Sequence, residues 1–152
     1  MNRILACTAI MILAGCAEPN VLSPTQLNSN PMLYNGITVS VRGYVVLAPE
    51  GHNLRDSKEV FDEFARHFDP SLPRDPTFDV RNHENECLTI GNPGFLYDHI
   101  DVFKGKTIIF RGRFITDYLN DHVVDLGACP LPTALIIDID DLKARYGREI
   151  NP

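Results

Sequence analysis

One strand pattern with fixed glycines occurs twice in this chain, and it constrains the fold more than any other feature. Residues 36–43, Gly-Ile-Thr-Val-Ser-Val-Arg-Gly, align with residues 105–112, Gly-Lys-Thr-Ile-Ile-Phe-Arg-Gly, matching both glycines and the arginine. In the first copy apolar and polar side chains alternate, which is the period of a β-strand. In each copy a glycine turn leads into a strand that bends at a second glycine, the device that closes a small barrel at its corners. We therefore expect two long, strongly curved strands in one barrel.

The remaining periodicities predict an ordered set of further elements. The expected strands cover residues 51–55, 86–90, 122–126, as the hairpin partner of the second long strand, and 134–139. A helix over 57–68 is predicted from an apolar stripe and an N-terminal cap at Asp56 or Ser57. A short helix over 95–103 ends at Gly105, and a last helical turn or two starts at Asp140 or Asp141. Prolines at every third position from Pro70 to Pro76 predict an extended surface connection.

The order strand, strand, helical insertion, strand, helix, strand, strand is that of the oligonucleotide/oligosaccharide-binding (OB) barrel. The motifs Tyr34-Asn35-Gly36…Val39-Ser40-Val41-Arg42-Gly43-Tyr44 and Phe103-Lys104-Gly105-Lys106…Arg111-Gly112-Arg113-Phe114 resemble those of small bacterial lipoproteins and periplasmic domains of this type. The resemblance implies a mainly β, OB-fold-like barrel of five to six strands over residues 33–152. It has a helix between strands 3 and 4 and a helical insertion after strand 2. A two-sheet β-sandwich is the alternative.

The N-terminal sixteen residues have the order of a lipoprotein signal. Arg3 gives a positive start, residues 4–13 are apolar, and Leu13-Ala14-Gly15-Cys16 resembles a bacterial lipobox. The apolar run is shorter than the roughly 20 residues that span a bilayer. The resemblance implies that residues 1–15 are removed and that lipid on Cys16 anchors the protein to a membrane. Because Ala17 stands where aspartate would retain a lipoprotein at the inner membrane, we expect the outer membrane, facing the periplasm, in a Gram-negative envelope. An ordinary signal peptide, or a buried N-terminal helix, is the alternative.

Residues 16–32 are polar and interrupted by prolines, so the lipidated cysteine is predicted to lead into a flexible tether. The alternative for its last part is a short entry helix packed through Leu27, Met32 and Leu33. Once Cys7 leaves with the signal and Cys16 is acylated, Cys87 and Cys129 remain. An even pair in an oxidising compartment predicts a disulfide.

No catalytic, metal or cofactor signature is found in the sequence. The five histidines are scattered singly, and motifs such as Gly-x-Ser-x-Gly or His-Glu-x-x-His do not occur. The formal charge of −6 argues against nucleic acid as a partner. We expect a non-enzymatic binding or scaffolding module for an envelope protein or glycan. An envelope enzyme or metal-binding protein with an unrecognised site is the alternative.

The barrel resemblance also predicts where a partner binds. OB barrels use the face of strands 2 and 3 and the loops that join strands 1 to 2 and 4 to 5, here residues 49–52 and 116–120. Arginines and tyrosines near these places suit an anionic or sugar-like ligand through charge-assisted hydrogen bonds and stacking. The candidate binding residues are Arg42, Tyr44, Arg111, Arg113 and Tyr118.

Overall fold

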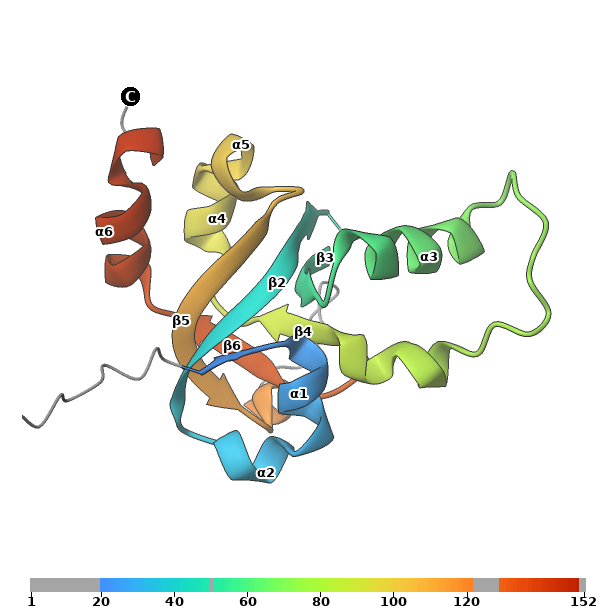
Figure 1. Cartoon of the computed structure of the whole chain (residues 1–152), viewed down its shortest axis with the longest axis horizontal. Helices are drawn as coiled ribbons and strands as arrows, with labels where there is room; N and C mark the ends of the chain where they lie inside the picture. Colours follow the sequence, from blue (N-terminus) through green and yellow to red (C-terminus); the bar gives the residue numbers. More distant parts are fainter. Residues whose placement is uncertain (1–19, 50, 122–128, 151–152) are drawn as a thin grey trace, which may run out of the picture.

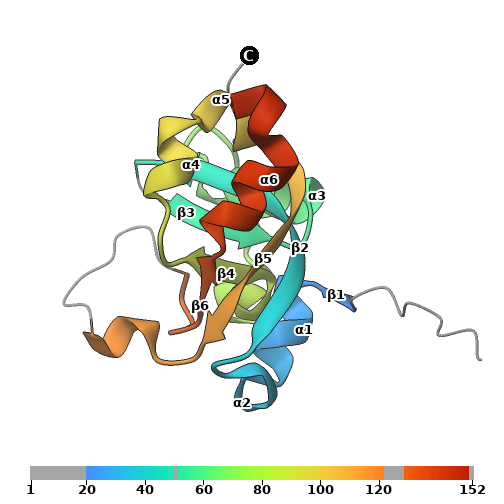
Figure 2. The same ribbon diagram turned by 90° about the vertical axis from the view of Figure 1, so that its left-hand side faces the viewer.

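A computed structural model describes residues 20–49, 51–121 and 129–150 of the chain (Figures 1 and 2). In chain order the elements are β1 (Val21–Leu22), α1 (Pro24–Ser29), α2 (Pro31–Tyr34), β2 (Thr38–Ala48), β3 (Gly51–Arg55), α3 (Lys58–Phe68), the 3-10 helix η1 (Val80–Glu86), β4 (Cys87–Ile90), α4 (Gly94–Asp98), α5 (Ile100–Phe103), β5 (Thr107–Ile115), the 3-10 helix η2 (Tyr118–Asp121), β6 (Ala134–Ile137) and α6 (Ile139–Ile150).

Five of the strands close into a barrel. The sheet runs β2-β3-β4-β6-β5, and β5 returns to pair with β2. The β4–β6 pair is parallel, whereas β2–β3, β3–β4, β5–β6 and β2–β5 are antiparallel. The extra strand β1 lies parallel to β2. This topology confirms the mainly β, OB-fold-like barrel, and the sandwich alternative is wrong because β2–β5 pairing joins what would be two separate sheets.

The two copies of the glycine pattern lead into β2 and β5. These strands pair antiparallel, so a local two-fold axis relates one copy to the other. The Gly36 amide donates to Phe114 O (2.8 Å), and the Gly105 amide donates to Val45 O (2.9 Å). Both glycines have positive φ, +76° and +73°, a conformation that side chains disfavour. The repeat in the sequence therefore encodes two equivalent entries into the central strand pair.

The second glycine of each copy stands where its strand acquires another neighbour. β2 pairs with β5 up to Tyr44 and with β3 from Tyr44 onward, and Gly43 precedes this change. β5 begins to pair with β6 at Gly112. A Cβ on Gly43 would lie 2.8 Å from Leu54 Cβ, and one on Gly112 would lie 2.5 Å from Ile136 O. Glycine at these corners thus permits the close strand approach that barrel closure requires.

The barrel interior and one of its ends carry the apolar core. Inward side chains of the strands include Val41, Val45, Leu54, Leu88, Ile90, Phe110, Phe114 and Leu135, all fully buried. Leu96 of α4 and Phe103 of α5 join them, as the predicted helix between strands 3 and 4 requires. That helix is divided in two because His99 leaves helical geometry (φ −126°, ψ 42°).

The expectation of a flexible tether over residues 16–32 is wrong for its described part. Leu22 pairs with Val41, and α1 follows with a Ser23/Gln26 capping box and Pro24 at its first position. Leu27 is fully buried, so this segment belongs to the domain. The alternative entry helix is present as α1 and α2, although Met32 and Leu33 stay exposed.

The insertion after strand 2 is helix α3, which is capped by the Ser57 hydroxyl as expected. Its apolar stripe lies over the outside of the barrel, where Phe61 contacts Tyr44 and Phe64 contacts Arg55. Figure 1 shows α3 leaving the barrel on the side away from α6. The proline-rich connection after it is exposed and held by aspartate turns, such as Asp69 accepting from the Ser71 amide (2.8 Å).

Cys87 of β4 and Cys129 form the predicted pair, with sulfurs at bonding distance and Cα atoms 5.6 Å apart. The strand expected over residues 122–126 lies outside the described residues. Among the described strands, β2 and β6 are the antiparallel neighbours of β5.

Candidate functional site

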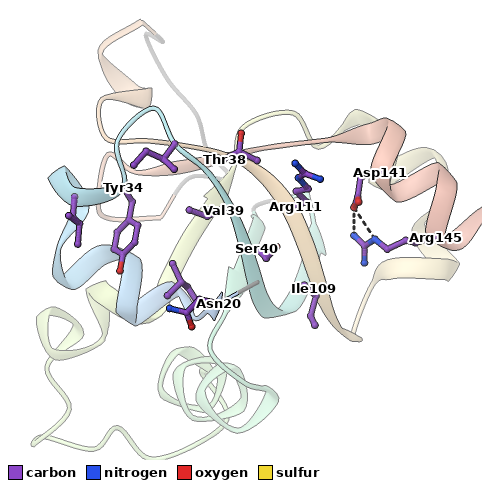
Figure 3. A pocket seen from close by; sticks show the side chains of 12 residues that line it. Asn20, Tyr34, Thr38, Val39, Ser40, Ile109, Arg111, Asp141 and Arg145 are labelled. Carbon is purple, nitrogen blue, oxygen red and sulfur yellow. Dashed lines mark hydrogen bonds and ion pairs between the residues drawn. The ribbon is translucent and has the colours of Figure 1, made fainter. Parts of the chain in front are cut away.

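A groove of about 820 Å³ lies over the outer face of β2 and β5 (Figure 3). We call it the β2–β5 groove. In Figure 3, Asn20 and Tyr34 lie at one side of it, and Asp141 and Arg145 lie at the other. Its lining residues are Asn20, Leu22, Leu33, Tyr34, Ile37, Thr38, Val39, Ser40, Ile109, Arg111, Asp141 and Arg145.

The floor of the groove follows from strand alternation. Val41 and Phe110 point into the core, so Ser40 and Arg111, which are paired across the two strands, point outward. Ile109 lies one outward position along β5 from Arg111 and is half-buried. The floor therefore combines an apolar side chain, a hydroxyl and a guanidinium.

Two helices form the walls. α2 contributes Leu33 and Tyr34, and its chain turns into β2 through Gly36. α6 is tied to β5 because the Asp138 amide donates to Arg111 O (2.9 Å), and Asp138 Oδ1 caps the helix by accepting from the Asp141 amide (3.1 Å). The distance between the walls is thus set by backbone hydrogen bonds.

The charged side chains of the groove differ in whether they are free to pair with a ligand. Arg145 Nη2 and Nε bind Asp141 Oδ2 at 2.6 and 2.8 Å, so this pair is internally neutralised. Arg111 is exposed, and within the described residues its guanidinium has no hydrogen bond or ion pair. A ligand in the groove would therefore meet apolar surface and one available cation, which suits a carboxylate or another anion.

The wider face is cationic although the chain is acidic. Residues 20–49 and 102–116 contain no aspartate or glutamate, whereas the whole chain has 20. The same two segments carry five cations: Arg42, Lys104, Lys106, Arg111 and Arg113. The strands β2 and β5 therefore form a basic region on a chain of net negative charge.

The structure separates the five predicted binding residues. Arg42, Arg111 and Arg113 all project from the outer face of β2 and β5, and all three are exposed. Arg111 lines the groove, and Arg42 lines a neighbouring hollow of about 530 Å³ beside β1 and Asp56. Tyr44 is covered by Phe61, with ring centroids 5.6 Å apart.

Tyr118, the fifth candidate, is packed inward, and its role in binding stays a prediction. It is 8% exposed, and a Cβ added at Gly91 would lie 3.1 Å from its ring. The start of the loop between strands 4 and 5 is thus packed inward at this residue. The loop between strands 1 and 2 is short, since Gly51 and His52 already belong to β3.

The face of strands 2 and 3, expected to bind a partner, is closed in this protein. Its outward residues on β3, Asn53 and Arg55, are each only 7% exposed. α3 covers Arg55 with Phe64, 4.3 Å from guanidinium carbon to ring centroid. Burial lowers the pKa of Arg55, and the charge of Glu86 partly opposes this change.

α1 and the disulfide partner close the β4 side of this face. Asn28 Nδ2 donates to Cys87 O, and the Cys129 amide donates to Thr89 Oγ1. The open outer face is therefore that of β2 and β5, which are strands 1 and 4 of the barrel.

Sequence reasoning missed most of the groove walls, notably Leu33, Tyr34, Ile37, Asp141 and Arg145. The four-residue spacing of Asp141 and Arg145 on a helix was a usable signal for their ion pair. The apolar residues of α2 carried no such signal, because their exposure depends on tertiary structure.

No family model, curated protein or solved structure matches this chain in the three comparisons. Within the described part of the chain, no helix has the length and apolarity needed to cross a bilayer, and no cluster of three or more potential metal ligands occurs.

Proposed function

We propose that the protein is a lipid-anchored binding module of the bacterial envelope, without catalytic activity, and that it holds its partner in the β2–β5 groove. The observation that carries the binding role is the unpaired, exposed Arg111 on an apolar floor within the described surface. The anchor on Cys16 and the envelope location rest on the lipobox resemblance.

The chemistry of the groove favours a protein segment over a glycan. Apolar atoms form most of its exposed lining surface, whereas a glycan needs a dense set of polar partners and open aromatic faces. Tyr34 is the groove's aromatic residue among the described ones, and it is half-buried. We infer an extended partner segment with apolar side chains and a carboxylate that pairs with Arg111.

The titratable groups of the groove support binding more than turnover. Asp141 is already occupied by Arg145, and a guanidinium remains protonated at all physiological pH values. A general acid or base instead needs a pKa near the working pH. Arg111 is suited to orient an anion by a fixed charge and a directional fork of donors.

Site-directed photocrosslinking in cells tests this function. Benzoylphenylalanine replaces Thr38, which is exposed in the groove, or Leu72, which is exposed on the far side of α3. We expect a discrete adduct from position 38 and not from position 72. Arg111→Glu should remove that adduct, whereas Arg148→Glu, a charge reversal outside the groove lining, should not. An adduct unchanged by Arg111→Glu would refute the proposed role of the groove.

A further inference from the structure

We infer that Met32, Leu33 and Ile37 form a membrane-docking surface that inserts into the lipid headgroup region and holds the groove at the bilayer. We call these three residues the α2 patch. They are exposed by 76%, 67% and 50%, although side chains of this kind are stabilised by leaving water. The inference rests on the proposed lipid anchor at Cys16, and it adds a second, non-covalent contact with the same membrane.

The patch is presented by a rigid frame. Pro31 starts α2, and the Ile37 amide donates to Tyr34 O (3.0 Å), which fixes Ile37 beside the helix. Asn35 Oδ1 accepts from the Thr116 amide (3.2 Å), and this bond joins the turn to the end of β5. These bonds hold the apolar side chains outward, so their exposure is a property of the fold.

The position of the anchor favours the bilayer as the partner that covers the α2 patch. Asn20 lies in the same groove lining as Leu33 and Ile37, and β1 then fixes the chain to β2. Only four peptide steps separate Cys16 from Asn20, a span of at most about 15 Å at 3.8 Å per step. A lipid on Cys16 therefore keeps Asn20, and with it this side of the barrel, within about 15 Å of the anchored residue.

Positive charge beside the α2 patch also favours an orientation in which the patch faces the membrane. Arg113 pairs with Thr38 at the start of β2, next to the patch. Arg111, two residues earlier on β5, pairs with Ser40. Both are exposed, and residues 20–49 contain no acid that would be repelled by anionic lipid. Cations within about 10 Å of an anionic surface are attracted to it at physiological salt.

A single-tryptophan experiment tests the inference, because the natural chain contains no tryptophan. Leu33→Trp places the reporter in the α2 patch, and Leu72→Trp places it at a matched exposed apolar site, 42% exposed, beyond α3. Each full-length protein is purified from bacterial membranes and reconstituted into vesicles of phosphatidylethanolamine and phosphatidylglycerol. Part of the lipid is brominated to quench tryptophan by contact.

We expect the bromolipid to quench Leu33→Trp strongly and to leave Leu72→Trp unchanged. If neither protein is quenched while both sediment with vesicles, the anchor stands and the docking surface is refuted. If neither sediments, the anchor and the docking surface are both refuted, because each is expected to bind the membrane. If Leu33→Trp is protected from aqueous iodide yet not quenched by bromolipid, a protein covers the patch and the inference is wrong.

A paired substitution gives a second measurement. Met32→Ser with Leu33→Ser should weaken vesicle binding of the Cys16→Ser protein by at least about tenfold, since two apolar side chains lose their burial. Phe68→Ser with Leu72→Ser removes two other exposed apolar side chains, 57% and 42% exposed, at the far end of α3 and should change binding by less than about twofold. Equal effects of the two pairs would overturn the assignment of the docking surface to α2.

Discussion

Replacement of Gly112 by alanine tests how the barrel closes. A Cβ there would lie 2.5 Å from Ile136 O and 3.0 Å from Ile136 C, and both atoms belong to the backbone of the paired strand β6. The clash cannot be relieved by rotating a side chain, so β5 and β6 must separate. Overpacking costs about 1–3 kcal/mol, and a backbone obstacle places Gly112→Ala near the upper end, about 3 kcal/mol.

Two further alanine variants calibrate this prediction. At Gly43 the nearest atom is Leu54 Cβ at 2.8 Å, so we expect a cost of about 1–3 kcal/mol. At Gly94 nothing lies within 4 Å of the added carbon. Gly94→Ala should therefore be neutral or stabilising by about 0.4–1 kcal/mol through the unfolded chain.

Urea unfolding of the three variants and the natural protein measures these differences. With equal m-values, a shift of the midpoint reports a change in the free energy of unfolding. A loss of about 3 kcal/mol is a large part of the 5–15 kcal/mol that stabilises a typical domain. If Gly112→Ala is as stable as Gly94→Ala to within about 0.5 kcal/mol, glycine is not required for close strand approach, and the reasoning fails.

Two other predictions concern how the N-terminal segment and β4 are held. Replacing Cys87 and Cys129 together by alanine should lower the free energy of unfolding by up to about 4 kcal/mol, since a cross-link over 42 residues is lost; an unchanged urea midpoint under reducing and oxidising conditions would contradict the disulfide. Asn28→Ala should cost about 2–4 kcal/mol, because the buried amide donates to Asn85 O and Cys87 O and accepts from Thr133 Oγ1. Asn30→Ala, at an exposed position without a side-chain cap bond, is its control, and similar midpoints for the two variants would disprove the role of Asn28.

The barrel could be predicted because its determinants are local. Alternation along 37–43 marks an amphipathic strand, and the four glycines of the repeat mark its turns and corners. The structure gives these glycines two distinct physical roles, positive φ at Gly36 and Gly105 and close strand contact at Gly43 and Gly112. Such constraints act on the backbone itself, so they are visible in one sequence.

The prediction of a flexible tether was wrong because it relied on amino-acid composition and overlooked a helix-capping pattern. Its prolines and asparagines are typical of a linker, yet Pro24 stands at the first position of α1 and Ser23 and Gln26 form a capping box. That Ser-Pro-x-Gln pattern is a helix start. Leu22 and Leu27 are buried against the barrel, and Pro24 and Asn28 are buried beside them.

The groove could not be predicted from the sequence, because it is defined by what other elements leave uncovered. α1 and α3 close the outer face of β3 and β4, where the barrel type implies binding, and leave β2 and β5 open. Strand alternation predicts the outward direction of Arg111, and the structure shows this side chain exposed in the groove lining. Alternation says nothing about Tyr118, a loop residue that packs against Gly91.

Intact-mass analysis of the protein purified from bacterial membranes tests the proposed function most directly. The account predicts one mature species that begins at Cys16, carries acyl chains on that residue, and retains no residue of 1–15. This result would establish the anchor on which the envelope location and the docking of the α2 patch rest. A species that begins at another residue, or that carries Cys16 without lipid, would contradict the anchor, the envelope location and the docking orientation together.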